Sequence, residues 1–145
     1  MRPFLFASLL ATLALAGCST GRKGSAGFHL PDGDPVMGRA VFVSLKCHAC
    51  HSVPGAEVPA PVVEPLVTVE LGGRVPVPRT DGELVAAIVD PSHRLAPGYE
   101  RHLVASGKIS RMGDFSESMT VRELIDLVAF VQSRYEVVPP TYPHQ

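Results

Sequence analysis

The sequence places two cysteines and two histidines within five consecutive residues, where Cys47, His48, Cys50 and His51 surround a single alanine. Side chains of these types can bind a metal ion, close a disulfide, act as a catalytic thiol or attach a larger group. The chain of 145 residues contains only one further cysteine, Cys18. The role of this cluster therefore decides what the rest of the chain has to fold around.

The N-terminal residues have the pattern of an export signal. Arg2 precedes an apolar run from Phe4 to Ala16, and small residues follow. The run is shorter than the roughly 20 apolar residues that a membrane-spanning helix needs. We therefore predict that residues 1–17 are a signal peptide that is removed.

The end of this signal, from Leu15 to Cys18, resembles the lipobox of bacterial lipoproteins. In that class the cysteine is lipidated and becomes the first residue of the mature chain. The resemblance implies a protein that is anchored to a bacterial membrane by a lipid on Cys18 and faces the periplasm or the cell surface. An ordinary secretory signal with an unrelated cysteine is the alternative.

Composition favours a single folded domain behind a short tether. Residues 18–34 are rich in Gly and Ser and predict a lipidated, flexible tether. Apolar residues make up 46% of the chain and the formal net charge is −1, which argues against a nucleic-acid partner. We assign the domain to residues 35–138 and a disordered, Pro-rich tail to residues 139–145.

The first predicted helix begins after Asp34, a good N-cap, with Pro35 at its first position. Gly38 and Phe42 lie one turn apart on one face of this helix. Glycine weakens a helix unless another backbone has to come close, so the pair predicts a tight helix crossing.

Two capping boxes mark later helices. Thr80 and Glu83 open a helix that should end at Asp90, where a proline follows. Thr120 and Glu123 open the clearest helix, whose apolar spacing continues to Tyr135. A short helix over residues 99–106 is also expected.

Prolines dominate the segment between the cluster and the second helix. They forbid regular helix there and make a sheet interior improbable, so we predict a long ordered loop that wraps around something. The six residues are Pro54, Pro59, Pro61, Pro65, Pro76 and Pro78.

The cluster has the Cys-x-x-Cys-His form of covalent c-type haem attachment. On a helix, residues three apart are separated by about 60° of rotation and a rise of about 4.5 Å, which suits two thiols reaching neighbouring substituents of one planar group. The pattern predicts thioether bonds from Cys47 and Cys50, with His51 as the proximal iron ligand.

Other interpretations of the cluster fit less well. A structural zinc site needs four closed ligands, whereas the remaining histidines are scattered singly. A redox dithiol is expected in a βαβ context, which the chain does not indicate, and a catalytic thiol lacks a helper network.

Met112, in a Gly-containing loop before the last helix, is the preferred second axial ligand to the iron. Met119 directly precedes the N-cap Thr120. An apolar residue at this position normally packs against the fourth residue of the helix, here Leu124, and this structural role accounts for Met119 without iron ligation. Met119, His93 and His102 remain the alternatives.

The assembled pattern resembles the class I cytochrome c family. The resemblance is carried by Gly38 and Phe42, by Cys47 to His51, by Pro65-Leu66 and Gly73-Arg74, and by Met112 to Gln132. It implies an all-α fold whose N- and C-terminal helices cross where Gly38 and Phe42 meet residues 128–131. Gly113 stands where the family typically has proline, whereas Phe115 fits the family pattern.

The resemblance also implies roles for residues outside the motif. Family members orient the proximal histidine through a backbone carbonyl, for which Pro61 and Pro65 both qualify. Arg74 is a candidate partner for a haem propionate, or else a solvated loop residue.

The predicted function is that of a membrane-anchored monohaem carrier, with one covalent haem c, which passes single electrons between redox partner proteins and is not an enzyme. The alternatives are a haem subunit of a larger oxidoreductase, and a gas-binding or peroxidase-like protein with a labile second axial ligand. Four basic residues near Met112 form either a docking surface for an acidic redox partner or a solvated face: Arg94, Arg101, Lys108 and Arg111.

Overall fold

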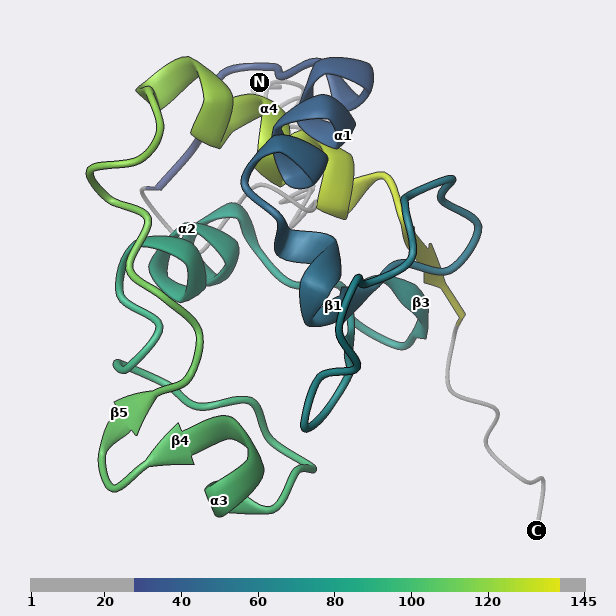
Figure 1. The fold of residues 1–145 in the computed structure, drawn as a ribbon. Coiled ribbons are helices and arrows are strands. Elements are labelled where there is room, and N and C mark those ends of the chain that lie inside the picture. Colours follow the sequence, from purple (N-terminus) through teal and green to yellow (C-terminus); the bar gives the residue numbers. More distant parts are fainter. Residues whose placement is uncertain (1–27, 139–145) are drawn as a thin grey trace, which may run out of the picture.

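A computed structural model describes residues 28–138 of the protein. Figure 1 shows its helices gathered mainly at one end and a small hairpin at the other. The α-helices are α1 (Pro35–Ser44), α2 (Asp81–Val89), α3 (Arg101–Val104) and α4 (Val121–Gln132). The strands are β1 (His51–Ser52), β2 (Val69–Glu70), β3 (Gly73–Val75), β4 (Ala105–Ser106), β5 (Ile109–Ser110) and β6 (Tyr135–Val137).

The predicted all-α fold is wrong, because short strands form three two-stranded sheets within residues 28–138. Parallel pairing joins β1 to β2 and β3 to β6, and antiparallel pairing joins β4 to β5. The prolines of residues 53–78 all lie outside the paired positions. The prolines therefore prevent a helix in this segment, but they still allow the short pairing of β1 with β2, in which His51 lies opposite Val69.

The crossing of α1 and α4 is confirmed and forms the centre of the core. A Cβ added to Gly38 would overlap the backbone of Asp126 and the Cβ of Phe130, so only glycine permits this approach. One turn along, the ring centroids of Phe42 and Phe130 are 5.4 Å apart, and both side chains are almost fully buried. This is the aromatic packing expected of a close helix pair.

The predicted caps are confirmed. Asp34 accepts hydrogen bonds from the first turn of α1, and both capping boxes form at Thr80 and Thr120. Helix α4 is shorter than predicted, because it ends at Gln132 and Tyr135 belongs to β6 instead. Pairing with β3 supplies the backbone partners that another helical turn would have given.

The short helix expected over residues 99–106 is only partly confirmed. Helix α3 covers Arg101–Val104, and the next two residues form β4. Gly107 adopts a positive φ of 62°, which lets the chain reverse direction into β5.

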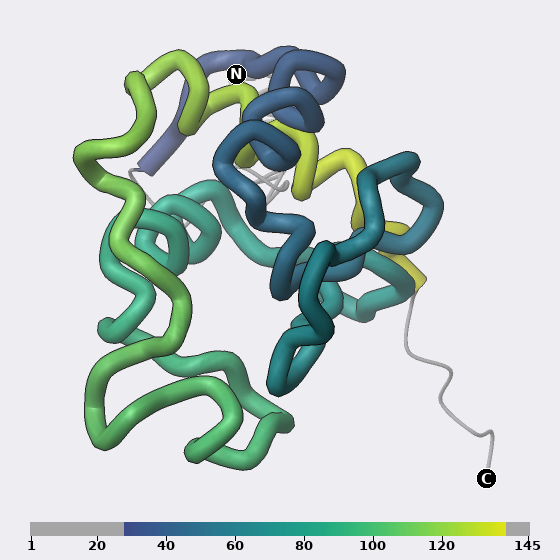
Figure 2. Tube along the Cα trace, in the orientation of Figure 1, coloured from purple at the N-terminus to yellow at the C-terminus, as the bar shows by residue number. Residues whose placement is uncertain are grey.

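Residues 91–112, which we call the hairpin segment, leave the helical part after α2 and return toward α4, as the green stretch of the tube in Figure 2 shows. Its elements α3, β4 and β5 make their main contacts with one another. Val104 and Ala105 are buried within it but do not belong to the main core cluster. Links to the rest include a 3.3 Å ion pair from Arg94 to Glu83 and a 3.4 Å hydrogen bond from the Glu70 amide to the Tyr99 hydroxyl.

The predicted signal peptide and Cys18 lie outside the described residues. The last residues before α1 contact the helices directly: Leu30 packs against the core, and the Asp34 amide donates to Asp126 Oδ1 at 2.8 Å. No helix between residues 28 and 138 has both the length and the apolar character to cross a membrane.

Candidate functional site

The cluster begins at a sharp turn after α1. The amides of Leu45 and Lys46 bond to the Val41 and Val43 carbonyls, which ends the helix. Lys46 then takes left-handed backbone angles, φ 58° and ψ 27°, a conformation that costs a non-glycine residue roughly 1–2 kcal/mol. The expectation that Cys47 and Cys50 lie on a regular helix is therefore wrong.

Cys47 begins a single 3₁₀ turn, Cys47–Ala49, and Cys50 follows it. The Cys50 amide donates to the Cys47 carbonyl at 3.1 Å, which holds the two residues in one compact loop. Cys50 has a φ of −130° and lies outside the 3₁₀ residues, so this hydrogen bond, rather than regular helix geometry, keeps the two cysteines close together.

The two thiols are free and differ in environment. Cys47 is half-buried and packs against the main core, and this burial raises the pKa of its thiol to about 11 against the opposing effect of a backbone hydrogen bond. Cys50 is exposed. Because a nucleophilic cysteine needs a lowered pKa, the Cys47 environment does not favour a catalytic thiol.

His51 lies in β1, where its ring is oriented by the neighbouring strand. Its Nδ1 is 3.1 Å from the Val69 carbonyl oxygen, and the Val69 amide in turn donates to the Cys50 carbonyl at 2.9 Å. Since a carbonyl only accepts, this bond places the proton on Nδ1 and leaves the Nε2 lone pair available. Val69, rather than Pro61 or Pro65, therefore supplies the orienting carbonyl.

Burial lowers the pKa of His51 below its usual value, and the hydrogen bond to Val69 only partly opposes this effect. The imidazole is thus held neutral, which is the form that ligates a metal. His48, on the same turn, has its Nδ1 buried without a hydrogen-bond partner among the described residues. That nitrogen does not face solvent.

Met112 is half-buried at the edge of the same core that Cys47 contacts. Its amide donates to Ser110 Oγ at 3.1 Å, which fixes the chain at the end of the hairpin segment. Met119 and Leu124 also pack against this core, as expected for residues that flank a helix N-cap. The core thus borders both Cys47 and Met112.

The other predicted candidates lie on exposed surface. His93 and His102 belong to the hairpin segment, and His102 Nδ1 is 3.3 Å from Glu100 Oε2. Arg74, on β3, forms a 3.5 Å ion pair with Glu136 on β6, and both side chains are about two-thirds exposed or more. None of the contacts found within residues 28–138 joins Arg74 to the cysteine cluster.

The donor set fits a c-type haem. It consists of two free thiols on one turn, a neutral imidazole with an available Nε2, and a thioether bordering the same apolar core. No group of three or more His, Cys, Asp or Glu side chains within residues 28–138 could hold a metal ion.

The Pro-rich loop exposes apolar side chains that a porphyrin could cover. Val62, Val63 and Leu66 are 97%, 78% and 71% exposed. Single exposed apolar residues are ordinary, but several close together in the sequence indicate a surface that contacts another apolar group. This loop is also the segment between His51 and its partner strand β2.

Comparison of the chain with protein-family models, with curated proteins and with solved structures found no match.

Two features of the site are absent from the sequence argument. The sequence does not identify the Val69 carbonyl, because the surrounding prolines argue against strand pairing, although residues 67–69 are all β-branched and favour extended backbone. The left-handed turn at Lys46 has no sequence signal, because glycine or asparagine usually occupies such a position.

Proposed function

We propose that the protein is a monohaem c-type cytochrome that carries single electrons between redox partner proteins. The strongest support is the arrangement at the cluster, where two free thiols on one turn precede an imidazole whose Nδ1 is bonded to the Val69 carbonyl. Cys47 and Cys50 would hold the haem through thioether bonds, and His51 Nε2 would ligate the iron. When bound there, a c-type haem supplies an iron couple that gains and loses one electron.

The protein's own residues would set the properties of that couple. Val69 fixes the tautomer and the ring orientation of His51, and a hydrogen bond at Nδ1 makes the other nitrogen a better donor. The Met112 thioether, as second axial ligand, would raise the reduction potential relative to a second histidine. No substrate is chemically changed in this role.

The carrier would work at a membrane surface outside the cytoplasm. The apolar leader and the lipobox-like residues before Cys18 support export and lipid anchoring. Exported proteins normally use their cysteines in disulfides. Attachment of Cys47 and Cys50 to a haem would give both cysteines another role, so their presence is also consistent with export.

Reduction potential and spin state test this proposal together. The full-length protein should be produced in a host that matures c-type cytochromes, beside Met112→Ala and the control Met119→Ala. We expect the wild type and Met119→Ala to be low-spin and to titrate reversibly with one electron. Met112→Ala should have a lower potential, because loss of the thioether removes the ligand that favours the ferrous state.

Two results would contradict the proposal in different ways. A wild type that is high-spin and binds carbon monoxide rapidly would support the gas-binding or peroxidase-like alternative. A change of potential in Met119→Ala but not in Met112→Ala would refute the ligand assignment while leaving the attached haem in place.

A further inference from the structure

Positive charge is concentrated in the hairpin segment. Residues 91–112 contain four basic side chains and one acidic side chain, Glu100, whereas the whole chain has a net charge of −1. The remainder of the molecule is therefore net negative. Such a separation of charge creates a local positive potential even on a protein with almost no net charge.

Within residues 28–138, three of the four basic side chains have no acidic partner. Arg94 pairs with Glu83, but among residues 28–138 no carboxylate lies within ion-pair distance of Arg101, Lys108 or Arg111. These three side chains are exposed. Their charge is thus available to another molecule.

Backbone carbonyls hold both arginines in place. Arg101 Nε donates to the Gly107 carbonyl at 3.2 Å, and Arg111 Nε donates to the His102 carbonyl at 3.2 Å. No partner among residues 28–138 is found for the terminal Nη groups of either guanidinium, and these are atoms that form paired hydrogen bonds to a carboxylate. Less side-chain entropy is lost on binding when the stem is already fixed.

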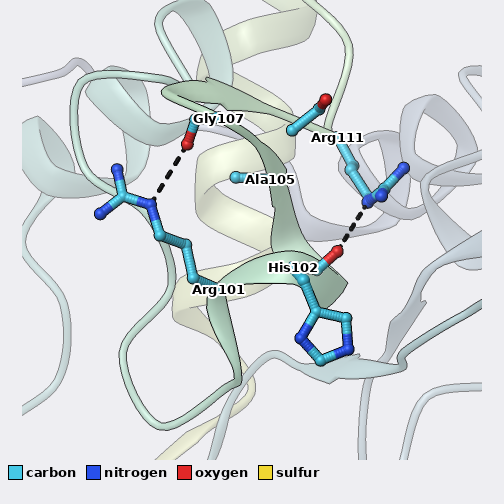
Figure 3. Close-up of a pocket in the computed structure, with 6 residues that line it drawn as sticks. Arg101, His102, Ala105, Gly107 and Arg111 are labelled. Atoms are coloured by element: carbon cyan, nitrogen blue, oxygen red, sulfur yellow. Dashed lines mark hydrogen bonds between the residues drawn. The ribbon is translucent and has the colours of Figure 1, made fainter.

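The arrangement suits a broad acidic surface better than one small anion. Arg101 and Arg111 line an open hollow of about 490 Å³, yet their guanidinium groups extend to opposite sides of the hairpin in Figure 3. A second hollow, of about 370 Å³, lies between Arg101 and Lys108. Several separated carboxylates can contact all three cations, whereas a single phosphate cannot.

We propose that the hairpin segment is a docking surface for a protein partner with an acidic face, whose carboxylates contact Arg101, Lys108 and Arg111. The partner's role in exchanging electrons rests on the proposed function, because Arg111 directly precedes Met112. The docking itself rests only on the charges and hydrogen bonds of the hairpin.

Binding to poly-L-glutamate, as a carboxylate-rich probe, tests the surface directly. The full-length, matured protein is titrated at low ionic strength, beside Arg101→Gln/Arg111→Gln and the control Arg39→Gln/Arg122→Gln. The control removes the same charge from exposed positions on α1 and α4. We expect about tenfold weaker binding for the hairpin pair and less than about twofold for the control.

Salt and a single substitution provide internal checks. Raising the ionic strength from about 0.01 M to about 0.1 M should weaken wild-type binding, because the screening length falls from about 30 to about 10 Å. Lys108→Gln removes a side chain for which no hydrogen bond or ion pair is found within residues 28–138, so it should fold normally and weaken binding about threefold.

The outcomes separate this inference from the proposed function. Equal weakening in both arginine pairs, no wild-type binding, or a loss in the hairpin pair that is larger for phosphatidylglycerol vesicles than for poly-L-glutamate would overturn the docking surface. Each preparation's absorption spectrum, recorded in parallel, reports on the haem. A protein that lacks haem but retains hairpin-dependent binding would contradict the proposed function alone.

Discussion

Phe42 and Phe130, on the crossing helices, are 1% and 0% exposed, whereas Ile109 on the β4–β5 hairpin is 70% exposed. The helical part buries its large side chains between α1 and α4. The hairpin segment instead buries only the small or medium side chains of Val104 and Ala105, outside the main core. The first region is therefore held by its own packing, whereas the second depends on few links to the rest.

The positions of the site residues follow this division. Cys47 lies three residues after the last residue of α1 and contacts the main core, so the turn that begins at Cys47 is supported by the well-packed region. Met112 lies where the hairpin segment returns to that core. A group bound between Cys47 and Met112 would therefore connect the well-packed region to the weakly connected one.

Amide hydrogen exchange should show the largest difference between the two regions. Amides of α1 and α4 open only when the core unfolds, whereas those of β4 and β5 need only local opening. We expect exchange in the hairpin to be faster by on the order of a thousandfold. Equal protection in both regions, measured by NMR or mass spectrometry on the full-length protein, would show that the hairpin is not a separate unit.

Gly38→Ala should be far more damaging than Gly113→Ala. The added methyl group would overlap the Asp126 backbone at the helix crossing, whereas at Gly113 the nearest atoms are 3.9 Å away on the Phe115 ring. We expect a loss of about 3 kcal/mol in the free energy of unfolding for Gly38→Ala and less than about 0.5 kcal/mol for Gly113→Ala. Urea denaturation measures both, and similar losses would refute the close crossing.

The two thiols should react at different rates in protein from a host that does not attach haem. Alkylation of the exposed Cys50 should be about tenfold faster than that of Cys47 near neutral pH, because burial keeps the Cys47 thiol protonated. A raised pKa lowers the thiolate fraction, so the Cys47 rate should continue to rise until the pH reaches about 11. Peptide mass spectrometry measures both rates, and faster reaction at Cys47 would contradict its burial.

The helical part could largely be predicted from local sequence signals. The N-cap Asp34 and the capping boxes at Thr80 and Thr120 identify helix starts, because each satisfies backbone amides within a few residues. The Gly38 and Phe42 pair likewise gave the correct helix crossing. The caps depend on neighbours in the chain, and a glycine on a helix face indicates a close approach whichever segment makes it, so the sequence alone contains these signals.

The short strands could not be predicted in the same way. The pairing of β3 with β6 joins Gly73 to Tyr135, and the pairing of β1 with β2 brings Val69 beside His51. Such contacts between two or three residues are decided by tertiary packing rather than by propensity. The motif thus identifies the donors that we propose for the site, but it indicates neither the carbonyl that orients His51 nor the left-handed turn at Lys46.

The proposed function depends on covalent attachment of a haem to Cys47 and Cys50. The most direct measurement is the mass of the intact, denatured protein after production in a host that matures c-type cytochromes, beside Cys47→Ala/Cys50→Ala. We predict that the wild type retains one haem through denaturation and that the double variant has only its polypeptide mass. A colourless wild type at its bare polypeptide mass would contradict the claim.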